Sequence, residues 1–102
     1  MNSLVSIVIL NYNGKKFNQA CLSSVLQQSY TNFEIIFVDN ASRDGSVEEV
    51  EKNFETEIIS GKIKVIRNKI NTGFSGGNNI GVAHADSQSF YICLLNNDTT
   101  VP

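Results

Sequence analysis

Asparagine and aspartate gather at four points of this chain, each directly after a short apolar run. The four clusters begin at Asn11, Asp39, Asn68 and Asn96. Amide and carboxylate oxygens accept hydrogen bonds from a ligand, and carboxylates also bind divalent cations. One cluster alone would indicate only a turn, because Asn, Asp, Ser and Gly commonly make turns after strands. Four clusters at one edge of a sheet predict a ligand site there.

A glycine-rich segment between the third and fourth apolar runs matches neither common phosphate-binding loop. Its glycines at 73, 76, 77 and 81 lack a Gly-Lys-Ser/Thr ending and follow the third run rather than the first. A diphosphate can instead be held through a magnesium ion, which takes one or two carboxylates together with phosphate oxygens and waters. Asp98, directly after the fourth run, is placed for that role.

Four apolar runs, rich in Ile, Val, Phe and Tyr, predict the strands that carry these clusters. The runs are Leu4–Leu10, Glu34–Val38, Ile63–Arg67 and Phe90–Leu95. Because successive positions are apolar, both faces of the sheet should be covered. Helical patterns between the runs predict a β-α-β-α-β-α-β chain, with right-handed crossovers and an open parallel sheet flanked by helices.

Three segments predict the helices. The first has a buried stripe of Phe17, Cys21, Leu22, Val25 and Leu26, with Asn18, Gln19, Ser23 and Gln27 on its other side. In the second, Ser46 and Glu49 predict a capping box, followed by a buried stripe of Val47, Val50 and Phe54. The third runs from Gly73 to Ala85, where glycines permit close approach to a sheet or a ligand. Residues 55–62 have no predicted element.

The composition fits one domain over residues 1–102, with 41% hydrophobic and 18% charged residues. Scattered basic residues and a net charge of −2 disfavour nucleic acid as a partner. The apolar runs are far shorter than the roughly 20 residues of a membrane span, and no signal sequence is recognisable. We therefore expect a cytoplasmic chain without a transmembrane segment. Cys21 and Cys93 are expected to be buried, reduced thiols.

Four strings of the sequence resemble, in order and spacing, the nucleotide-binding motifs of the inverting family-two glycosyltransferases. They are VSIVILNYNG, IIFVDNASRDGS, NTGFSGGNNIGVAHA and LLNNDTTVP. The resemblance implies the GT-A fold, in which a Rossmann-like sheet begins with strand order 3-2-1-4. It also implies a nucleotide-diphospho-sugar donor, a divalent cation (Mg²⁺ or Mn²⁺), and a saccharide or lipid-linked glycan as acceptor.

The same resemblance implies roles for individual residues. Three of them, Asn11, Tyr12 and Asn13, would line the nucleotide pocket. Asp39 would accept a hydrogen bond from the pyrimidine N–H, with Asn40 and Ser42 beside it. The segment from Gly73 through Asn78 to Asn79 would close over the nucleotide. The metal motif would be Asn96, Asn97 and Asp98, with Asp98 as the metal ligand and the neighbouring amides on the nucleotide side.

The metal motif departs from the family's Asp-x-Asp pattern, because Asn96 stands at the first aspartate. The resulting Asn-Asn-Asp motif resembles the variant motifs of rhamnosyl and related bacterial transferases. This resemblance favours a uridine or thymidine diphospho-sugar as donor. In the family, the acceptor-binding half and the general base follow this motif. The chain is therefore expected to be a donor-binding half, inactive alone, with its catalytic base beyond Pro102 in a parent enzyme that could work at the cytoplasmic face of the membrane.

The expected strand order has one further implication. Phe90–Leu95 would be an unprotected apolar edge, which favours a homodimer through the fourth strand.

Three other interpretations stay open from the residues alone. One is a calcium loop with an EF-hand frame, formed by Asn40, Ser42, Asp44, Gly45, Val47 and Glu51. Its first position lacks an aspartate, however, and a β-branched run stands where a helix must enter. The second is a nucleotidyltransferase-like or dinucleotide-binding domain of similar topology. The third is a module that binds a nucleotide without catalysis.

Lesser polar residues have simpler interpretations. His84, near the end of the third helix, is expected to be solvated or to complement the helix dipole. Lys15, Lys16 and Arg43 lie near the predicted ligand edge, where they would solvate the surface or meet phosphate.

Overall fold

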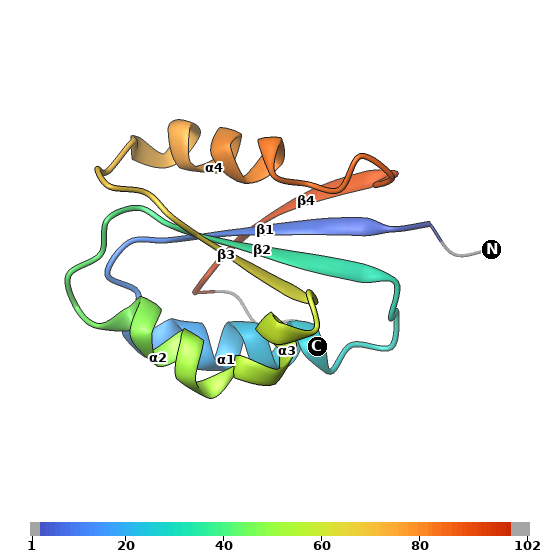
Figure 1. Cartoon of the computed structure of the whole chain (residues 1–102), viewed down its shortest axis with the longest axis horizontal. Coiled ribbons are helices and arrows are strands. Elements are labelled where there is room, and N and C mark those ends of the chain that lie inside the picture. Colours follow the sequence, from blue (N-terminus) through green and yellow to red (C-terminus); the bar gives the residue numbers. More distant parts are fainter. Residues whose placement is uncertain (1–2, 99–102) are drawn as a thin grey trace.

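A computed structural model describes residues 3–98, which form a parallel four-stranded sheet between two layers of helices (Figure 1). The strands are β1 (Val5–Asn11), β2 (Phe33–Asp39), β3 (Ile63–Arg67) and β4 (Tyr91–Asn96). Their order in the sheet is β3-β2-β1-β4, and each neighbouring pair is parallel. The predicted fold class and strand order are confirmed, with strand ends within about one residue of those predicted from the apolar runs.

The helices divide unequally between the two faces of the sheet. One face carries α1 (Lys15–Leu26), α2 (Ser46–Asn53) and α3 (Glu55–Ile59), and the other carries α4 (Gly73–Ala83) (Figure 1). The short α3 occupies the segment without a predicted element. No helix within residues 3–98 is long and apolar enough to cross a membrane.

The core explains why the apolar runs do not alternate. On the α1 side, Ile7, Ile9 and Phe37 pack with Leu22 of α1. On the α4 side, Val8, Ile36 and Val38 form a second, smaller cluster. All seven residues of β2 are buried, as expected for a central strand with both faces covered.

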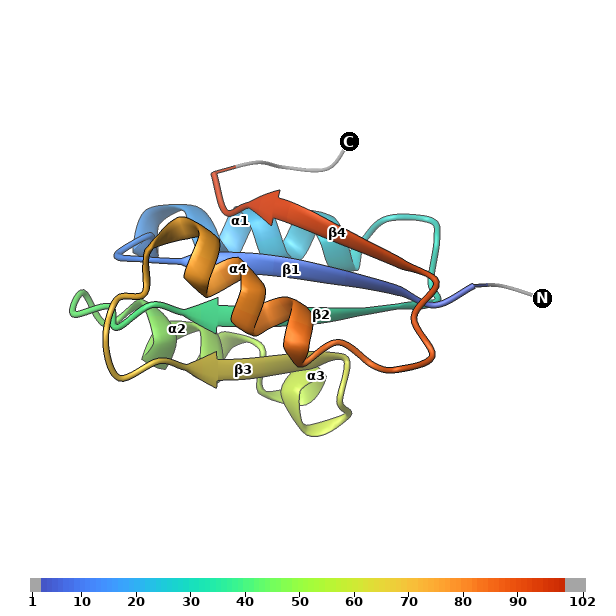
Figure 2. The same ribbon diagram turned by 90° about the horizontal axis from the view of Figure 1, so that it is seen from above.

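Two glycines allow α4 to lie close to the sheet. A Cβ atom at Gly77 would overlap the side chain of Leu10, and one at Gly81 would overlap Val8. The glycines therefore serve the packing of helix against sheet, one of the two uses predicted for them. This close contact aims the first turn of α4 at the carboxyl edge of the sheet, as Figure 2 shows from above.

Two polar residues of the helices do not behave as their local patterns predict. Asn18 is buried rather than solvent-facing, because it bonds to other amides below the β1 end. The predicted capping box is also wrong. Gly45 is the N-cap of α2, and Asp44 Oδ1 accepts from the Ser46 amide at 3.0 Å. The Ser46 hydroxyl accepts instead from Asn11 Nδ2 at 2.8 Å, a contact that a local pattern does not reveal.

A buried carboxylate fastens the connection from α4 to β4. Glu34 Oε2 accepts from Ser6 Oγ at 2.6 Å and from the Asp86 amide at 2.7 Å, while Oε1 pairs with Lys64 Nζ at 2.8 Å. Burial raises the pKa of the Glu34 carboxyl, but these hydrogen bonds and the Lys64 charge together lower it by more. Its pKa therefore lies below the ordinary value, and the ionised form stabilises the fold.

Strand β4 is the exposed edge of the sheet. Among residues 3–98 it pairs only with β1 (Figure 2). Phe90, Tyr91, Ile92 and Leu94 are all exposed. Cys93 is exposed as well, so the prediction of two buried thiols holds for Cys21 but is wrong for Cys93. An apolar sequence predicts a strand, but it does not tell a central strand from an uncovered edge.

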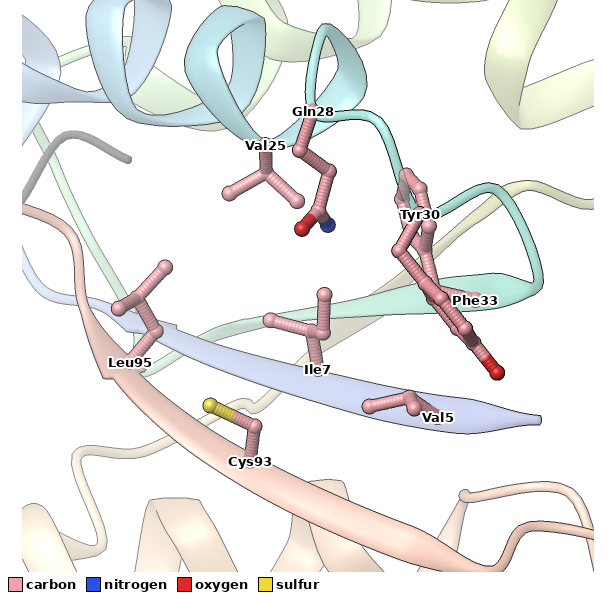
Figure 3. Close-up of a pocket in the computed structure, with 8 residues that line it drawn as sticks. All are labelled: Val5, Ile7, Val25, Gln28, Tyr30, Phe33, Cys93 and Leu95. Atoms are coloured by element: carbon pink, nitrogen blue, oxygen red, sulfur yellow. The ribbon is translucent and has the colours of Figure 1, made fainter. Parts of the chain in front are cut away.

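An apolar hollow of about 240 Å³ opens beside this edge, under the end of α1 (Figure 3). It is lined by Val5, Ile7, Val25, Gln28, Tyr30, Phe33, Cys93 and Leu95. Its walls are nearly all apolar, in contrast with the opposite end of β1, where the asparagines lie.

Candidate functional site

The predicted clusters meet at the carboxyl edge of the sheet. Asn11 lies opposite Asp39 in the β1–β2 register, and Asn96 lies beside Leu10 in the β1–β4 register. The Asn68 amide donates to the Asp39 carbonyl at 2.8 Å, which brings in the end of β3. Because α1, α2 and α4 each follow a strand that ends here, their N-termini share this edge, where the helix dipoles favour an anion.

Asn11 is the centre of the polar cluster. It is fully buried, and its Nδ2 donates to Asp39 Oδ1 at 2.8 Å and to Ser46 Oγ at 2.8 Å. Its Oδ1 accepts from the Gly14 amide at 3.0 Å and from Asn18 Nδ2 and Asn97 Nδ2, each at 3.1 Å. Since this side chain faces only protein, any contribution to ligand binding comes through the residues it positions.

Asp39 is 4% exposed and already accepts two hydrogen bonds. Its Oδ1 accepts a hydrogen bond from Asn11 Nδ2, and its Oδ2 accepts one from the Ser42 amide at 3.0 Å. An ionised carboxylate has about four acceptor positions, so it can still accept from a ligand. Beside it lies a hollow of about 450 Å³, lined by Asp39, Ala41, Ser42, Arg43, Arg67, Asn68 and Lys69.

The loops after β1 and β2 hold each other in place. The Asn13 amide donates to Ser42 Oγ at 2.8 Å, and the Arg43 amide donates to Asn13 Oδ1 at 2.9 Å. Ala41 takes a left-handed backbone with φ of 67°, an uncommon conformation for a residue with a Cβ. Such conformations cost free energy and persist where the surroundings fix them. The wall of the hollow is therefore built from two loops that are bonded to each other.

Asn40 connects the same wall to the start of α4. It is 2% exposed, and its Oδ1 accepts from Asn68 Nδ2 and the Thr72 amide, each at 3.0 Å. Its Nδ2 donates to the Gly73 carbonyl at 3.0 Å. Asn40 therefore fixes where α4 begins. Asn78, also predicted to be at the site, is buried on the sheet side of α4.

A second hollow of about 280 Å³ contains the fourth cluster. It is lined by Leu10, Tyr12, Phe17, Phe74, Asn96, Asn97 and Asp98. The rings of Tyr12, Phe17 and Phe74 are exposed here and form an aromatic wall beside the Asp98 carboxylate. Among the residues predicted for nucleotide and metal, Asp39 and Ser42 line the first hollow, and Tyr12, Asn96, Asn97 and Asp98 line the second. The others line neither, but Asn11 bonds to a residue of each hollow, Asp39 and Asn97.

Asp98 is a suitable ligand for a hard cation only if other oxygens join it. Within residues 3–98 no three His, Cys, Asp or Glu side chains gather as a metal site. Both hydrogens of Asn97 Nδ2 are donated inward, to Asn11 and Asn18, so a ligand in this hollow meets its Oδ1. One carboxylate and a neutral oxygen match Mg²⁺ or Mn²⁺ held jointly with phosphate oxygens and water.

The Asp98 carboxylate influences the pKa of the Cys21 thiol. Burial, and secondarily the Asp98 carboxylate, raise the pKa of Cys21 to about 11. Cys21 therefore stays protonated at neutral pH and acts as a packing residue rather than a nucleophile or a metal ligand.

Several residues around the two hollows were not predicted from the sequence. Phe17 was expected in a buried stripe but is 39% exposed at the first turn of α1. Arg67 and Lys69 drew no functional prediction, although both border the Asn68 cluster, and Phe74 was covered only by the prediction that the glycine-rich segment closes over the nucleotide. Arg67 pairs with Glu48 and Glu51 of α2, which offsets its charge. Lys15 and Lys16 line neither of these hollows.

The sequence matches one family model over residues 6–102, and that model describes glycosyl transferase family 2. The chain belongs to this family. Among its relatives is the glycosyltransferase GlyG of Streptococcus pneumoniae, 30% identical over 99% of this chain and 32% of its own length. Another is WfgD of Escherichia coli, named as a UDP-Glc:α-D-GlcNAc-diphosphoundecaprenol β-1,3-glucosyltransferase, 32% identical over 93% of this chain and 35% of its own length.

Solved structures of glycosyltransferases share the fold. S. aureus TarS, residues 1–349, superposes with a TM-score of 0.79 at 25% identity, over 92% of this chain and 27% of TarS. It has been solved with UDP and with UDP-GlcNAc. The mannosyltransferase PcManGT of Pyrobaculum calidifontis, solved with GDP-Man and Mn²⁺, superposes at 0.84 over 96% of this chain and 28% of its own, with 21% identity. The chain thus spans about a third of its relatives or less.

The competing interpretations fare differently. The calcium loop is excluded, because strand β2 stands where an EF-hand needs an entering helix. Its would-be ligands Asn40 and Asp44 also bond to the protein backbone. Family membership favours a glycosyltransferase over a nucleotidyltransferase or a dinucleotide-binding domain. His84 lies at the C-cap of α4, exposed and away from both hollows, as predicted.

Proposed function

We propose that this chain is the donor-binding part of a glycosyltransferase that uses a uridine or thymidine diphospho-sugar. The observation that carries the proposal is the pair of hollows on either side of one polar cluster. One has a buried carboxylate at its wall, and the other has a carboxylate beside exposed aromatic rings. A nucleotide-sugar is itself elongated, with a base at one end and a diphosphate and sugar toward the other.

In this proposal the hollow beside Asp39 receives the base. A carboxylate accepts from the N3–H of uracil or thymine but has no hydrogen to offer the unprotonated N3 of cytosine. Asn13 and Ser42 hold the loop that faces the base, and Asn96 offers an amide to the ribose. Tyr12 lines the second hollow, and Gly73 begins the segment proposed to close over the nucleotide.

The second hollow receives the diphosphate. A divalent cation, Mg²⁺ or Mn²⁺, would be held by Asp98 with the neighbouring amide oxygen of Asn97, and it would neutralise the charge that develops on the leaving diphosphate. The N-termini of α1 and α4 add positive ends of helix dipoles, which favour the negative diphosphate in the same way as the cation. The reaction is displacement at the anomeric carbon of the sugar by an acceptor hydroxyl, on a saccharide or lipid-linked glycan.

Removal of the Asp98 carboxylate tests this assignment. We expect Mn²⁺ to strengthen the binding of UDP to the unmodified chain by about 5-fold or more, a typical coupling between two ligands. Asp98→Ala should lose most of that gain, while Glu55→Ala, which removes an exposed carboxylate on α3, should keep it. Isothermal calorimetry with and without Mn²⁺ gives both affinities. We also expect no sugar transfer by the 102-residue chain, because the base that activates the acceptor is proposed to lie outside it.

Two outcomes would contradict the proposal. If the affinity for UDP changes neither with Mn²⁺ nor with Asp98→Ala, the chain is a nucleotide-binding module without the metal chemistry. Transfer of sugar to an added acceptor by the purified chain would contradict the placement of the base.

The exposed β4 edge gives a separate expectation for the purified chain. Its residues carry no charge from Phe90 to Leu95, so two copies can pair edge to edge without like-charge repulsion. We expect a dimer by light scattering at high micromolar concentration. Leu94→Lys should give a monomer, and Ile59→Lys, which places the same charge on an exposed apolar position of α3, should not. A monomeric mass for the unmodified chain would contradict this expectation.

A further inference from the structure

The Asn11 side chain joins two parts of the site that lie far apart in the sequence. Its Nδ2 donates to Asp39 Oδ1 at 2.8 Å, across 28 residues, and its Oδ1 accepts from Asn97 Nδ2 at 3.1 Å, across 86 residues. Asn97 directly precedes Asp98. A single amide group therefore lies between the carboxylate proposed to read the base and the turn that carries the proposed metal ligand.

The orientation of this amide is fixed by its partners. The Asp39 carboxylate only accepts hydrogen bonds, and the Gly14 backbone N–H only donates them. An Asn11 amide turned by 180° would therefore lose bonds at both ends. Being fully buried, the group has no water to replace them. It cannot release one loop by flipping and still keep the other.

We infer that Asn11 is a positioning residue that couples nucleotide binding at Asp39 to divalent-cation binding at Asp98. The inference rests on the proposed function. Hydrogen bonds in a chain polarise one another, so a stronger bond at the amide oxygen strengthens donation by the amide nitrogen. A cation at Asp98 orders the turn that contains Asn97, which improves the contact of Asn97 with Asn11. Binding linkage requires the reverse effect to be equal.

Gly14 offers a way to weaken this connection without removing a polar group. A Cβ atom at residue 14 would overlap both Asn97 Nδ2 and Asn11 Oδ1, which it would approach to 2.7 Å. The φ of Gly14 is −100°, so an alanine fits the backbone itself. Because both overlapped atoms are the tips of side chains, Gly14→Ala should push the Asn97 and Asn11 amides apart. It leaves the Asp39 and Asp98 carboxylates in the chain.

The test measures a ratio rather than an affinity. The dissociation constant of UDP is determined by calorimetry with and without saturating Mn²⁺, and the ratio is the coupling factor. We expect a factor of about 5 or more for the unmodified chain, and a clearly smaller factor for both Gly14→Ala and Asn11→Ser, in which only the direct bond between cation and diphosphate still couples the two ligands. Ile63→Val, which shortens a buried side chain on β3, should lower stability but keep the full factor.

The outcomes separate this inference from the proposed function. If both variants bind UDP more weakly yet keep the full coupling factor, Asn11 only supports the fold and the inference is overturned. If the unmodified chain binds no UDP in either condition, the proposed function fails and the coupling fails with it. Should Asn11→Ser not fold, Gly14→Ala decides, because it keeps every polar side chain of the cluster.

Discussion

Asp39→Asn is expected to weaken UDP binding by about 1 to 3 kcal/mol, the contribution of a hydrogen bond to a charged acceptor. The affinity for CDP should fall less, because an amide N–H can donate to the N3 of cytosine and a carboxylate cannot. The ratio of UDP to CDP affinity is therefore the quantity to measure. It does not depend on what fraction of the variant is folded, since both ligands bind the same folded molecules.

This precaution matters because Asp39 also holds the protein together. Its two oxygens face two donors, Asn11 Nδ2 and the Ser42 amide, so one of them would meet the new NH₂ group. Some loss of stability is thus expected from Asp39→Asn itself.

A control variant exists in the same loop. The Asp44 carboxylate accepts from the amides of Ser46 at 3.0 Å and Lys15 at 3.1 Å, but it does not line the hollow beside Asp39. Partial burial raises the pKa of the Asp44 carboxyl, and these hydrogen bonds lower it by more, so they favour the ionised form. Asp44→Asn should therefore destabilise the loop but leave the UDP:CDP ratio unchanged. An unchanged ratio in Asp39→Asn as well would remove Asp39 from base recognition.

Glu34→Gln is expected to lower the free energy of unfolding by about 1.5 to 3 kcal/mol at pH 7, because it removes hydrogen bonds to a buried charged group. The amide oxygen can still accept from Ser6 and Asp86, but its NH₂ group would face the Lys64 ammonium. Urea unfolding at a series of pH values gives the measurement. Glu55→Gln, at an exposed position, should cost little at any pH.

The difference between wild type and Glu34→Gln should depend on pH with a definite sign. The pKa of Glu34 is lowered in the folded protein. The stability from its carboxylate is therefore fully present above the unfolded value of 4.5 and is lost as the pH falls through the lower, folded value. The unfolding free energies of wild type and Glu34→Gln should therefore converge as the pH is lowered below 4.5. A difference that stays constant down to pH 3 would contradict the role given to the carboxylate.

The sequence was sufficient to predict the sheet and the edge where polar residues meet. Each strand is an apolar run that ends at an asparagine, an aspartate or the residue before one. The position and the end of each strand can therefore be predicted from neighbouring residues alone. Alternation of strands and helices then left a parallel sheet as the expected solution. The convergence of Asn11, Asp39 and Asn96 follows from that topology alone.

Side-chain partners across the sheet could not be predicted in this way. Asn18 carries the local pattern of a solvent-facing residue, yet it is buried because Asn97, 79 residues later, supplies its partner. Ser46 carries the local pattern of an N-cap, yet its hydroxyl serves Asn11. In both cases a distant hydrogen bond prevails over a local preference. Such pairings are fixed by the three-dimensional fold, and a single sequence contains no separate signal for them.

The single-sided pairing of β4 also has a consequence for the order in which the site is assembled. The first three strands can pair through short crossovers, whereas β4 must return to β1 from about 80 residues away, at a greater cost in chain entropy. With one neighbour and most of its side chains exposed, β4 should also be the strand that opens most readily in the native protein. The wall beside Asp39 would thus form early and persist, and the strand that leads to Asp98 would join last and leave first.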